Sequence, residues 1–98
     1  MTRATISDSA TISIAPDVLA SELGPEVVML SLRDGTYYGL DGAGVEIWRM
    51  LQTTVTIPRI VAGLVETYDV DAERCRSDVL GVIRTLVERG LVEVREPA

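Results

Sequence analysis

The side chains that carry most enzyme chemistry are scarce in this 98-residue sequence. It contains no histidine and a single cysteine, Cys75, so neither a Ser/His/Asp nor a Cys/His arrangement can form within the chain. Asp69 and Asp71 pair two carboxylates, but they flank a predicted helix start, where capping and the helix dipole explain them. No glycine-rich phosphate-binding motif occurs. The sequence therefore predicts a protein that is not an enzyme and holds no metal or cofactor.

The charge balance narrows the kinds of partner. The sequence contains nine arginines and fifteen carboxylates, so its net charge is −6. A nucleic-acid-binding protein usually presents a basic patch instead. No apolar run approaches the roughly 20 residues that a membrane helix needs, and residues 1–10 lack the pattern of a signal peptide. We therefore expect a cytoplasmic protein that binds neither nucleic acid nor membranes and whose partner is another polypeptide.

The length and the 47% hydrophobic fraction are those of one folded domain. Residues 1–10 are polar and show no sustained period, which predicts a mobile N-terminal tail. We expect the domain to occupy residues 11–95.

Apolar alternation predicts a three-stranded antiparallel meander. Pro16 interrupts an early β-branched run, and the first dependable strand covers residues 18–23. A Gly-Pro turn leads into a second strand over residues 26–32. The next turn contains Asp34-Gly35, a hairpin signal, and the third strand follows over residues 36–40.

After the third strand the apolar period changes from two to 3.6, which predicts three helices. Asp41, Thr56 and Asp71 are the expected N-caps, and Gly90 fits the left-handed position that ends the third helix. Residues 91–95 alternate again and predict a short final strand.

The predicted fold class is α+β, a three-stranded antiparallel sheet followed by three helices in a winged helix-turn-helix-like arrangement. Such an outline is typical of DNA-binding regulators. Here the third helix balances its positive charges with negative ones and so lacks a basic face. The arginines are Arg74, Arg76, Arg84 and Arg89, and the carboxylates are Asp71, Glu73, Asp78 and Glu88.

The third strand of the meander has a neighbour on one side only. It contains no proline, lysine or inward charge, which are the usual devices against strand addition. Its edge is therefore either covered by another part of the chain or a docking site for an extended peptide. The alternative is a purely structural role, in which Tyr37 and Tyr38 pack over the sheet.

One flank of the third helix supplies a second wall for such a peptide. Ordinary core packing would also explain Cys75 and Val79, and Asp78 could be a solvated carboxylate. As a groove residue, Asp78 could pair with an arginine or lysine of the peptide. The candidate peptide-binding residues are Thr36, Tyr37, Tyr38, Gly39, Leu40, Cys75, Asp78, Val79 and Val82.

Three runs carry a family resemblance. They are YYGLDGAGVEIWRMLQ at residues 37–52, TIPRIVAGLVETYDVD at 56–71 and DVLGVIRTLVERGLV at 78–92. Their order and spacing resemble the PqqD-like family, the recognition elements of ribosomally synthesised, post-translationally modified peptides. The resemblance covers about residues 18–94. It is stronger to the small stand-alone proteins of lasso-peptide pathways than to the pyrroloquinoline quinone protein.

The resemblance implies a non-catalytic peptide chaperone. Members bind the leader segment of a precursor peptide as an added strand, here along residues 36–40 and against the third helix, and deliver it to a partner enzyme. In lasso pathways this partner is a cysteine protease. Three alternatives stay open: a winged-helix DNA-binding regulator, a structural subunit, and a carrier that works with a radical SAM enzyme. The leader sequence, the class of modified peptide and the oligomeric state also stay open.

Overall fold

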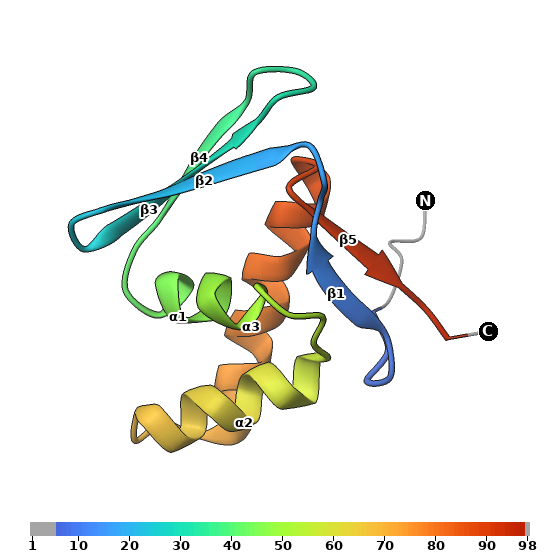
Figure 1. Cartoon of the computed structure of the whole chain (residues 1–98). Helices are drawn as coiled ribbons and strands as arrows, with labels where there is room; N and C mark the ends of the chain where they lie inside the picture. Colours follow the sequence, from blue (N-terminus) through green and yellow to red (C-terminus); the bar gives the residue numbers. More distant parts are fainter. Residues whose placement is uncertain (1–5, 98) are drawn as a thin grey trace.

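The computed structural model describes residues 6–97 and confirms an α+β fold (Figure 1). A three-stranded antiparallel sheet precedes three helices, as predicted, and a second sheet of two strands joins the ends of the domain. The elements are β1 (Thr11–Ile14), β2 (Val18–Leu23), β3 (Glu26–Ser31), β4 (Tyr37–Leu40), α1 (Ala43–Met50), α2 (Ile57–Thr67), α3 (Ala72–Glu88) and β5 (Val92–Arg95).

The first sheet has the order β2-β3-β4. Gly24 takes φ +63° in the turn between β2 and β3, as the first central residue of a tight type II′ hairpin requires. In the next hairpin, the Ser31 N–H donates to the Thr36 carbonyl at 2.9 Å. The Thr36 N–H donates to Asp34 Oδ1 at 3.0 Å, which lowers the pKa of that carboxyl. Because the Thr36 N–H bonds within the turn, Thr36 belongs to the turn, and β4 begins at Tyr37, one residue later than predicted.

The second sheet pairs β1 with β5, antiparallel. The predicted final strand is thus confirmed as β5, and the run before Pro16 also forms a strand. Ile12 pairs with Val94 on one side, and on the other its N–H donates to the Val55 carbonyl at 2.7 Å. These partners lie more than 40 residues away in sequence, so local alternation alone could not reveal the pairing.

The first two helices begin differently from one another. Thr56 caps α2 as predicted, accepting from the Arg59 N–H at 3.4 Å. The predicted Asp41 cap of α1 is wrong, because Gly42 is the N-cap and no side chain caps this helix. Gly42 has φ +53°, and the Asp41 carbonyl, rather than its carboxylate, accepts from the Gly44 N–H at 2.9 Å.

Both predicted ends of α3 are confirmed. The Asp71 carboxylate accepts from the Arg74 N–H at 3.0 Å. Gly90, at φ +72°, reverses the chain, and the Leu91 N–H then donates to the Leu86 carbonyl at 2.9 Å. This 6→1 bond is the mark of a Schellman motif, which satisfies a carbonyl at the helix end.

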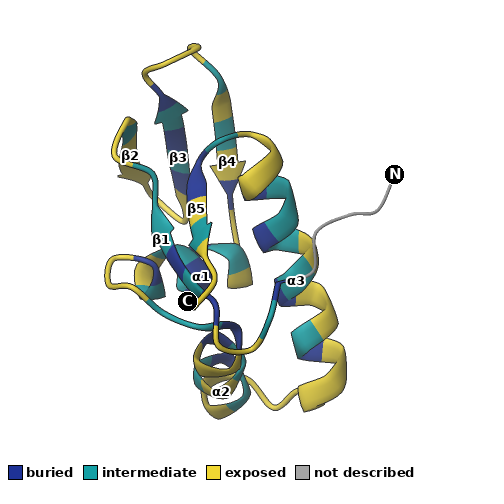
Figure 2. Cartoon of the chain, turned by 90° about the vertical axis from the view of Figure 1, so that its right-hand side faces the viewer, coloured by how far each residue is buried: buried dark blue, intermediate teal, exposed yellow. Residues whose placement is uncertain are grey.

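The core lies between the sheets and the helices. In Figure 1 the three helices lie on the same side of the β2-β3-β4 sheet, and Figure 2 shows buried segments of β3, β4 and α3. The large side chains that are fully buried include Ile12, Met29, Ile57, Ile60, Ile83, Leu86 and Leu91. No helix in residues 6–97 is long and apolar enough to cross a membrane.

The predicted N-terminal tail needs a correction over residues 6–10; residues 1–5 lie outside the described part of the chain. Ile6 is 8% exposed and Ala10 is fully buried, and both belong to the core cluster. The Ala10 N–H donates to the Ser7 carbonyl at 3.1 Å, which forms a turn. Two apolar residues on one turn are too few to show a period, so sequence patterning missed this packing.

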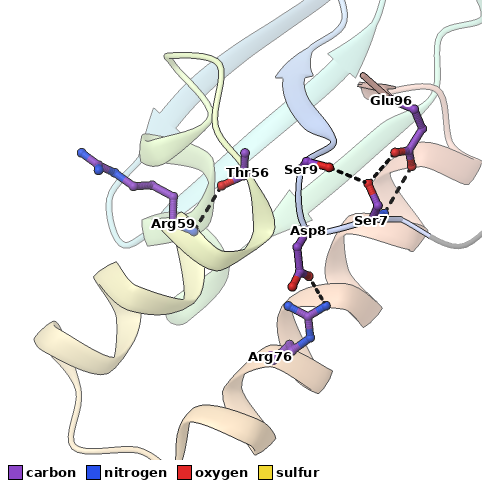
Figure 3. A network of polar contacts seen from close by, with 7 residues as sticks. All are labelled: Ser7, Asp8, Ser9, Thr56, Arg59, Arg76 and Glu96. Atoms are coloured by element: carbon purple, nitrogen blue, oxygen red, sulfur yellow. Dashed lines mark hydrogen bonds and ion pairs between the residues drawn. The ribbon is translucent and has the colours of Figure 1, made fainter. Parts of the chain in front are cut away.

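Polar contacts hold the same segment in place (Figure 3). The Ser7 N–H and Oγ donate to the Glu96 carboxylate at 3.2 and 2.5 Å. Asp8 forms an ion pair with Arg76 of α3. The segment therefore contacts both the C-terminal end of the domain and α3.

We predict that Ile6→Ala lowers the free energy of unfolding by about 2 kcal/mol, because it removes buried apolar atoms and leaves a cavity. Urea denaturation of the full chain measures this, with the exposed Ser9→Ala as the control. A loss below about 0.5 kcal/mol, the usual size of a surface effect, would show that residues 6–10 contribute no packing.

Candidate functional site

The outer edge of β4 is open: within residues 6–97 its only strand neighbour is β3. In an antiparallel pair, hydrogen-bonded and non-hydrogen-bonded residue pairs alternate. The Ser31–Thr36 bond lies in the same register as the strand pairs and fixes this alternation. Tyr38 and Leu40 therefore direct their backbone groups to β3. Tyr37 and Gly39 direct an N–H and a carbonyl each to the open edge.

The side chains of β4 alternate in the same way. Tyr38 and Leu40 lie across from Met29 and Val27, which are fully buried, so they occupy the core face. Tyr37 occupies the opposite face and is 66% exposed. Of the two tyrosines, only Tyr38 therefore lies on the core face, and Tyr37 points to solvent.

Tyr38 connects β4 to the end of α3. The guanidinium carbon of Arg89 lies 5.0 Å from the centroid of the Tyr38 ring, within the range of a cation–π interaction. Figure 2 shows α3 beside β4 on the side of its open edge. The C-terminal end of α3 therefore lies close to Tyr38 of β4.

The four candidate residues of α3 line one cavity of about 310 Å³. Cys75 and Val79 are buried, Val82 is half-buried, and Asp78 is exposed. Residues of α1, α2 and the α2–α3 connection complete the wall: Ala43, Gly44, Ile47, Leu64, Tyr68 and Val70, with Arg74 from α3. The lining is mainly apolar, with Arg74 and Asp78 as its charged members.

The five candidate residues of the strand segment do not line this cavity. Thr36 lies in the turn, and β4 ends beside the cavity at Leu40. A β-carbon placed on Gly44, a cavity residue, would lie 3.2 Å from Leu40 Cδ2. The C-terminal end of β4 therefore lies next to the cavity wall at Gly44.

Sequence reasoning missed the walls from α1 and α2. Ile47 and Leu64 fit the apolar 3.6 period of their helices and are buried, but that period gives no sign that they border a cavity. Tyr68 and Val70 could have indicated a binding surface, because they are apolar residues within the aspartate-rich connection between two helices. Both are exposed in the structure.

The Cys75 thiol behaves as an apolar wall group. Burial raises its pKa, and the nearby negative charge of Asp78 adds to the effect. A raised pKa keeps the thiol protonated near neutral pH, so it is a weak nucleophile. Within the described residues, no group of three or more His, Cys, Asp or Glu side chains could hold a metal ion.

The meander, the helix pair and the open edge define a small α+β domain with a helix-turn-helix-like arrangement. The chain belongs to the PqqD family, since the family model "Coenzyme PQQ synthesis protein D (PqqD)" matches residues 26–92. The match covers the three-stranded sheet from β3 onward and all three helices. No curated protein sequence matches the chain.

Two solved structures are similar to this chain. TbiB1 in complex with the TbiA(beta) leader peptide has a TM-score of 0.78 and 33% sequence identity, covering 83% of this chain and 94% of that chain. Lasso peptide synthetase B1 complexed with the leader peptide has a TM-score of 0.76 and 20% identity, covering 84% and 96%. The second likeness concerns the fold alone.

We predict that Cys75 reacts slowly with iodoacetamide, and that its rate in the folded chain rises at a higher pH than in the urea-unfolded chain. The direction follows because the folded-state pKa is raised. Asp78→Asn should move the folded profile toward lower pH by removing the adjacent charge. A folded profile that coincides with the unfolded one would contradict the assigned burial.

Proposed function

We propose that this protein binds the leader segment of a ribosomally synthesised precursor peptide as an added strand on β4, alongside α3. The leader then presents the rest of the precursor to a partner enzyme. The protein itself performs no catalysis in this scheme. The proposed contact residues are the nine predicted from the sequence, joined by the α1 and α2 residues of the cavity.

One combined observation carries the proposal. An open strand edge lies beside an apolar cavity, in a chain that is 33% identical to TbiB1 over 83% of its length. TbiB1 was solved with a leader peptide bound. Strand addition uses backbone bonds for affinity and side-chain pockets for specificity, and both features are present here.

The backbone contacts alone are too weak for selective binding. Tyr37 and Gly39 offer two donors and two acceptors, and each hydrogen bond contributes about 0.5–1.5 kcal/mol net. Association costs about 4 kcal/mol or more in lost freedom of motion. Burial of an apolar leader side chain in the cavity beside Val79 and Val82 supplies the remaining free energy. The leader must therefore carry an apolar anchor in register with this cavity.

Charge at the cavity adds selectivity. Asp78 is exposed beside the apolar wall, where it can pair with an arginine or lysine of the leader. Arg74 lines the same cavity and can pair with a leader carboxylate. The two charges at this cavity therefore favour a leader that places a basic residue near Asp78 and an acidic residue near Arg74.

The partner enzyme in this proposal is the leader-removing cysteine protease of a lasso-type pathway. The bound leader tethers the precursor, which raises the local concentration of its scissile segment at the protease. Nothing in this role requires a histidine or a reactive thiol on the carrier.

The α3 arginines do not favour the DNA-binding alternative. Arg76 pairs with Asp8, Arg89 stacks on Tyr38, and Arg84 has its Nε buried. These three side chains are engaged with the domain rather than extended for phosphate contacts. A helix of this kind also lacks the excess of positive charge that drives DNA binding.

We predict that Gly39→Pro lowers leader affinity at least tenfold, because proline removes the N–H that Gly39 directs to the open edge. Gly39→Ala is the matched control: it keeps the N–H, and its β-carbon meets nothing within 4 Å. Fluorescence anisotropy with a labelled TbiA(beta) leader peptide, the ligand in the TbiB1 structure, measures both affinities. Equal affinities of the two variants would rule out strand addition at this edge.

We also predict that Val82→Asp lowers leader affinity at least tenfold, because it places a charge in the apolar cavity wall. Val87→Asp is the control, since Val87 is on the same helix, is exposed and does not line this cavity. Circular dichroism checks that both variants fold. If the two substitutions weaken binding equally, the cavity is not the anchor site.

A further inference from the structure

Arg89, at the C-terminal end of α3, forms no ion pair within residues 6–97. The arginines that are paired there are Arg49 and Arg76. The guanidinium carbon of Arg89 instead lies 5.0 Å from the centroid of the Tyr38 ring. Stacking on a ring engages one face of the planar guanidinium, whereas its N–H donors lie within the plane. Arg89 is therefore held over Tyr38 and keeps donors for a further group on the same side of the sheet.

A second arginine reaches the same end of α3. A β-carbon placed on Gly90 would lie 2.8 Å from Nη2 of Arg33, which belongs to the turn between β3 and β4. The carboxylates next in sequence are Asp34 and Glu88, and in the described part of the chain neither forms an ion pair with Arg33 or Arg89. The helix dipole alone accounts for a cation at this place. The position of Arg89 relative to the open edge of β4 is what points to a ligand.

The register of an added strand places one leader side chain beside the Tyr38 ring. Such a strand bonds to the backbone groups of Tyr37 and Gly39, so the leader residue across from Tyr38 forms a non-hydrogen-bonded pair with it. In antiparallel ladders, the Cα atoms of such pairs are only about 4.5 Å apart and their side chains share one face. The Arg89 guanidinium occupies that same face, over the ring. This leader side chain therefore lies within reach of the Arg89 donors.

The chemistry of this place favours a carboxylate. A guanidinium only donates hydrogen bonds, and its planar fork matches the two oxygens of a carboxylate. The edge of an aromatic ring carries partial positive charge, so the Tyr38 ring also tolerates an anion beside it. A leader lysine or arginine would be repelled, and an apolar side chain would displace water from the guanidinium without replacing its hydrogen bonds.

We propose that Arg89 determines specificity by binding an aspartate or glutamate of the leader, at the leader position across from Tyr38. This inference rests on the proposed function and adds a sequence requirement to it. The next leader side chain on the same face is two residues away, across from Leu40, whose side chain lies at the Gly44 wall of the cavity. The leader therefore carries an acidic residue two positions from its apolar anchor. The acidic residue follows the anchor if the leader runs antiparallel to β4 and precedes it if the leader runs parallel.

The test measures how leader affinity depends on charge at each leader position. Labelled TbiA(beta) leader peptides, with each residue replaced in turn by glutamate and by lysine, are titrated by fluorescence anisotropy. They are titrated into the full-length wild-type protein, Arg89→Gln and Arg89→Glu. Arg59→Glu is the matched control, because Arg59 is an exposed arginine of α2 that does not line the cavity beside Val79. Circular dichroism checks that the variants fold. If Arg89→Glu does not fold, because its carboxylate opposes the helix dipole, Arg89→Gln decides the test.

In the wild-type protein, the leader position at which both charges weaken binding most marks the apolar anchor. Two residues from it, we expect glutamate to bind at least tenfold more tightly than lysine, because the exchange removes an attraction and adds a repulsion. This preference should fall to within twofold in Arg89→Gln, reverse in Arg89→Glu and remain in Arg59→Glu.

Three results would overturn the role of Arg89 while leaving leader binding intact. They are the absence of a charge preference at every leader position, a preference at a position that is not two residues from the anchor, and a preference that Arg89→Gln leaves unchanged. Failure of the wild-type protein to bind any of the leader peptides would instead overturn the proposed function.

Discussion

The antiparallel register between β3 and β4 controls what this domain can offer to a partner. Hydrogen bonds to β3 use the backbone groups of every second residue of β4, so the groups of Tyr37 and Gly39 remain at the edge. The same alternation sends Tyr38 into the core and Tyr37 outward. A register shift by one residue would exchange these roles. The Asp34–Thr36 contact in the hairpin turn helps to hold this register.

Helix α3 contacts β4 near one end and forms a cavity wall near the other. Arg89 packs over Tyr38 near the C-terminal end of the helix, and the Schellman motif at Gly90 fixes where the helix stops. Toward its N-terminal end, Cys75 and Val79 form the buried wall of the cavity that lies beside the end of β4. The spacing between strand and helix is therefore set by core packing.

Much of the fold and part of the candidate site could be predicted from local sequence patterns. Alternation identified the meander, the 3.6 period identified three helices, and Thr56, Asp71 and Gly90 marked helix ends by side-chain or backbone chemistry that acts within a few residues. The helix wall of the site followed from helical periodicity, since four residues at helical spacing must share one side.

The parts that were missed depend on contacts between distant residues. Strand β1 forms because β5 and Val55 pair with it, and Ile6 is buried by residues that no local window contains. The predicted Asp41 cap of α1 was wrong because Gly42, with a positive φ, is the N-cap, and the Asp41 carboxylate makes no capping bond. The distinction between Tyr37 and Tyr38 required the hydrogen-bond phase of the hairpin, which composition does not specify.

Amide hydrogen exchange along β4 tests strand addition most directly. In the free protein, the amides of Tyr38 and Leu40 should exchange slowly, since they bond to β3, and those of Tyr37 and Gly39 should exchange fast. Addition of the leader peptide should slow Tyr37 and Gly39 to the rate of their neighbours. Unchanged exchange at these two amides in a saturated leader complex would contradict the central claim, because the leader would then bind without pairing to β4.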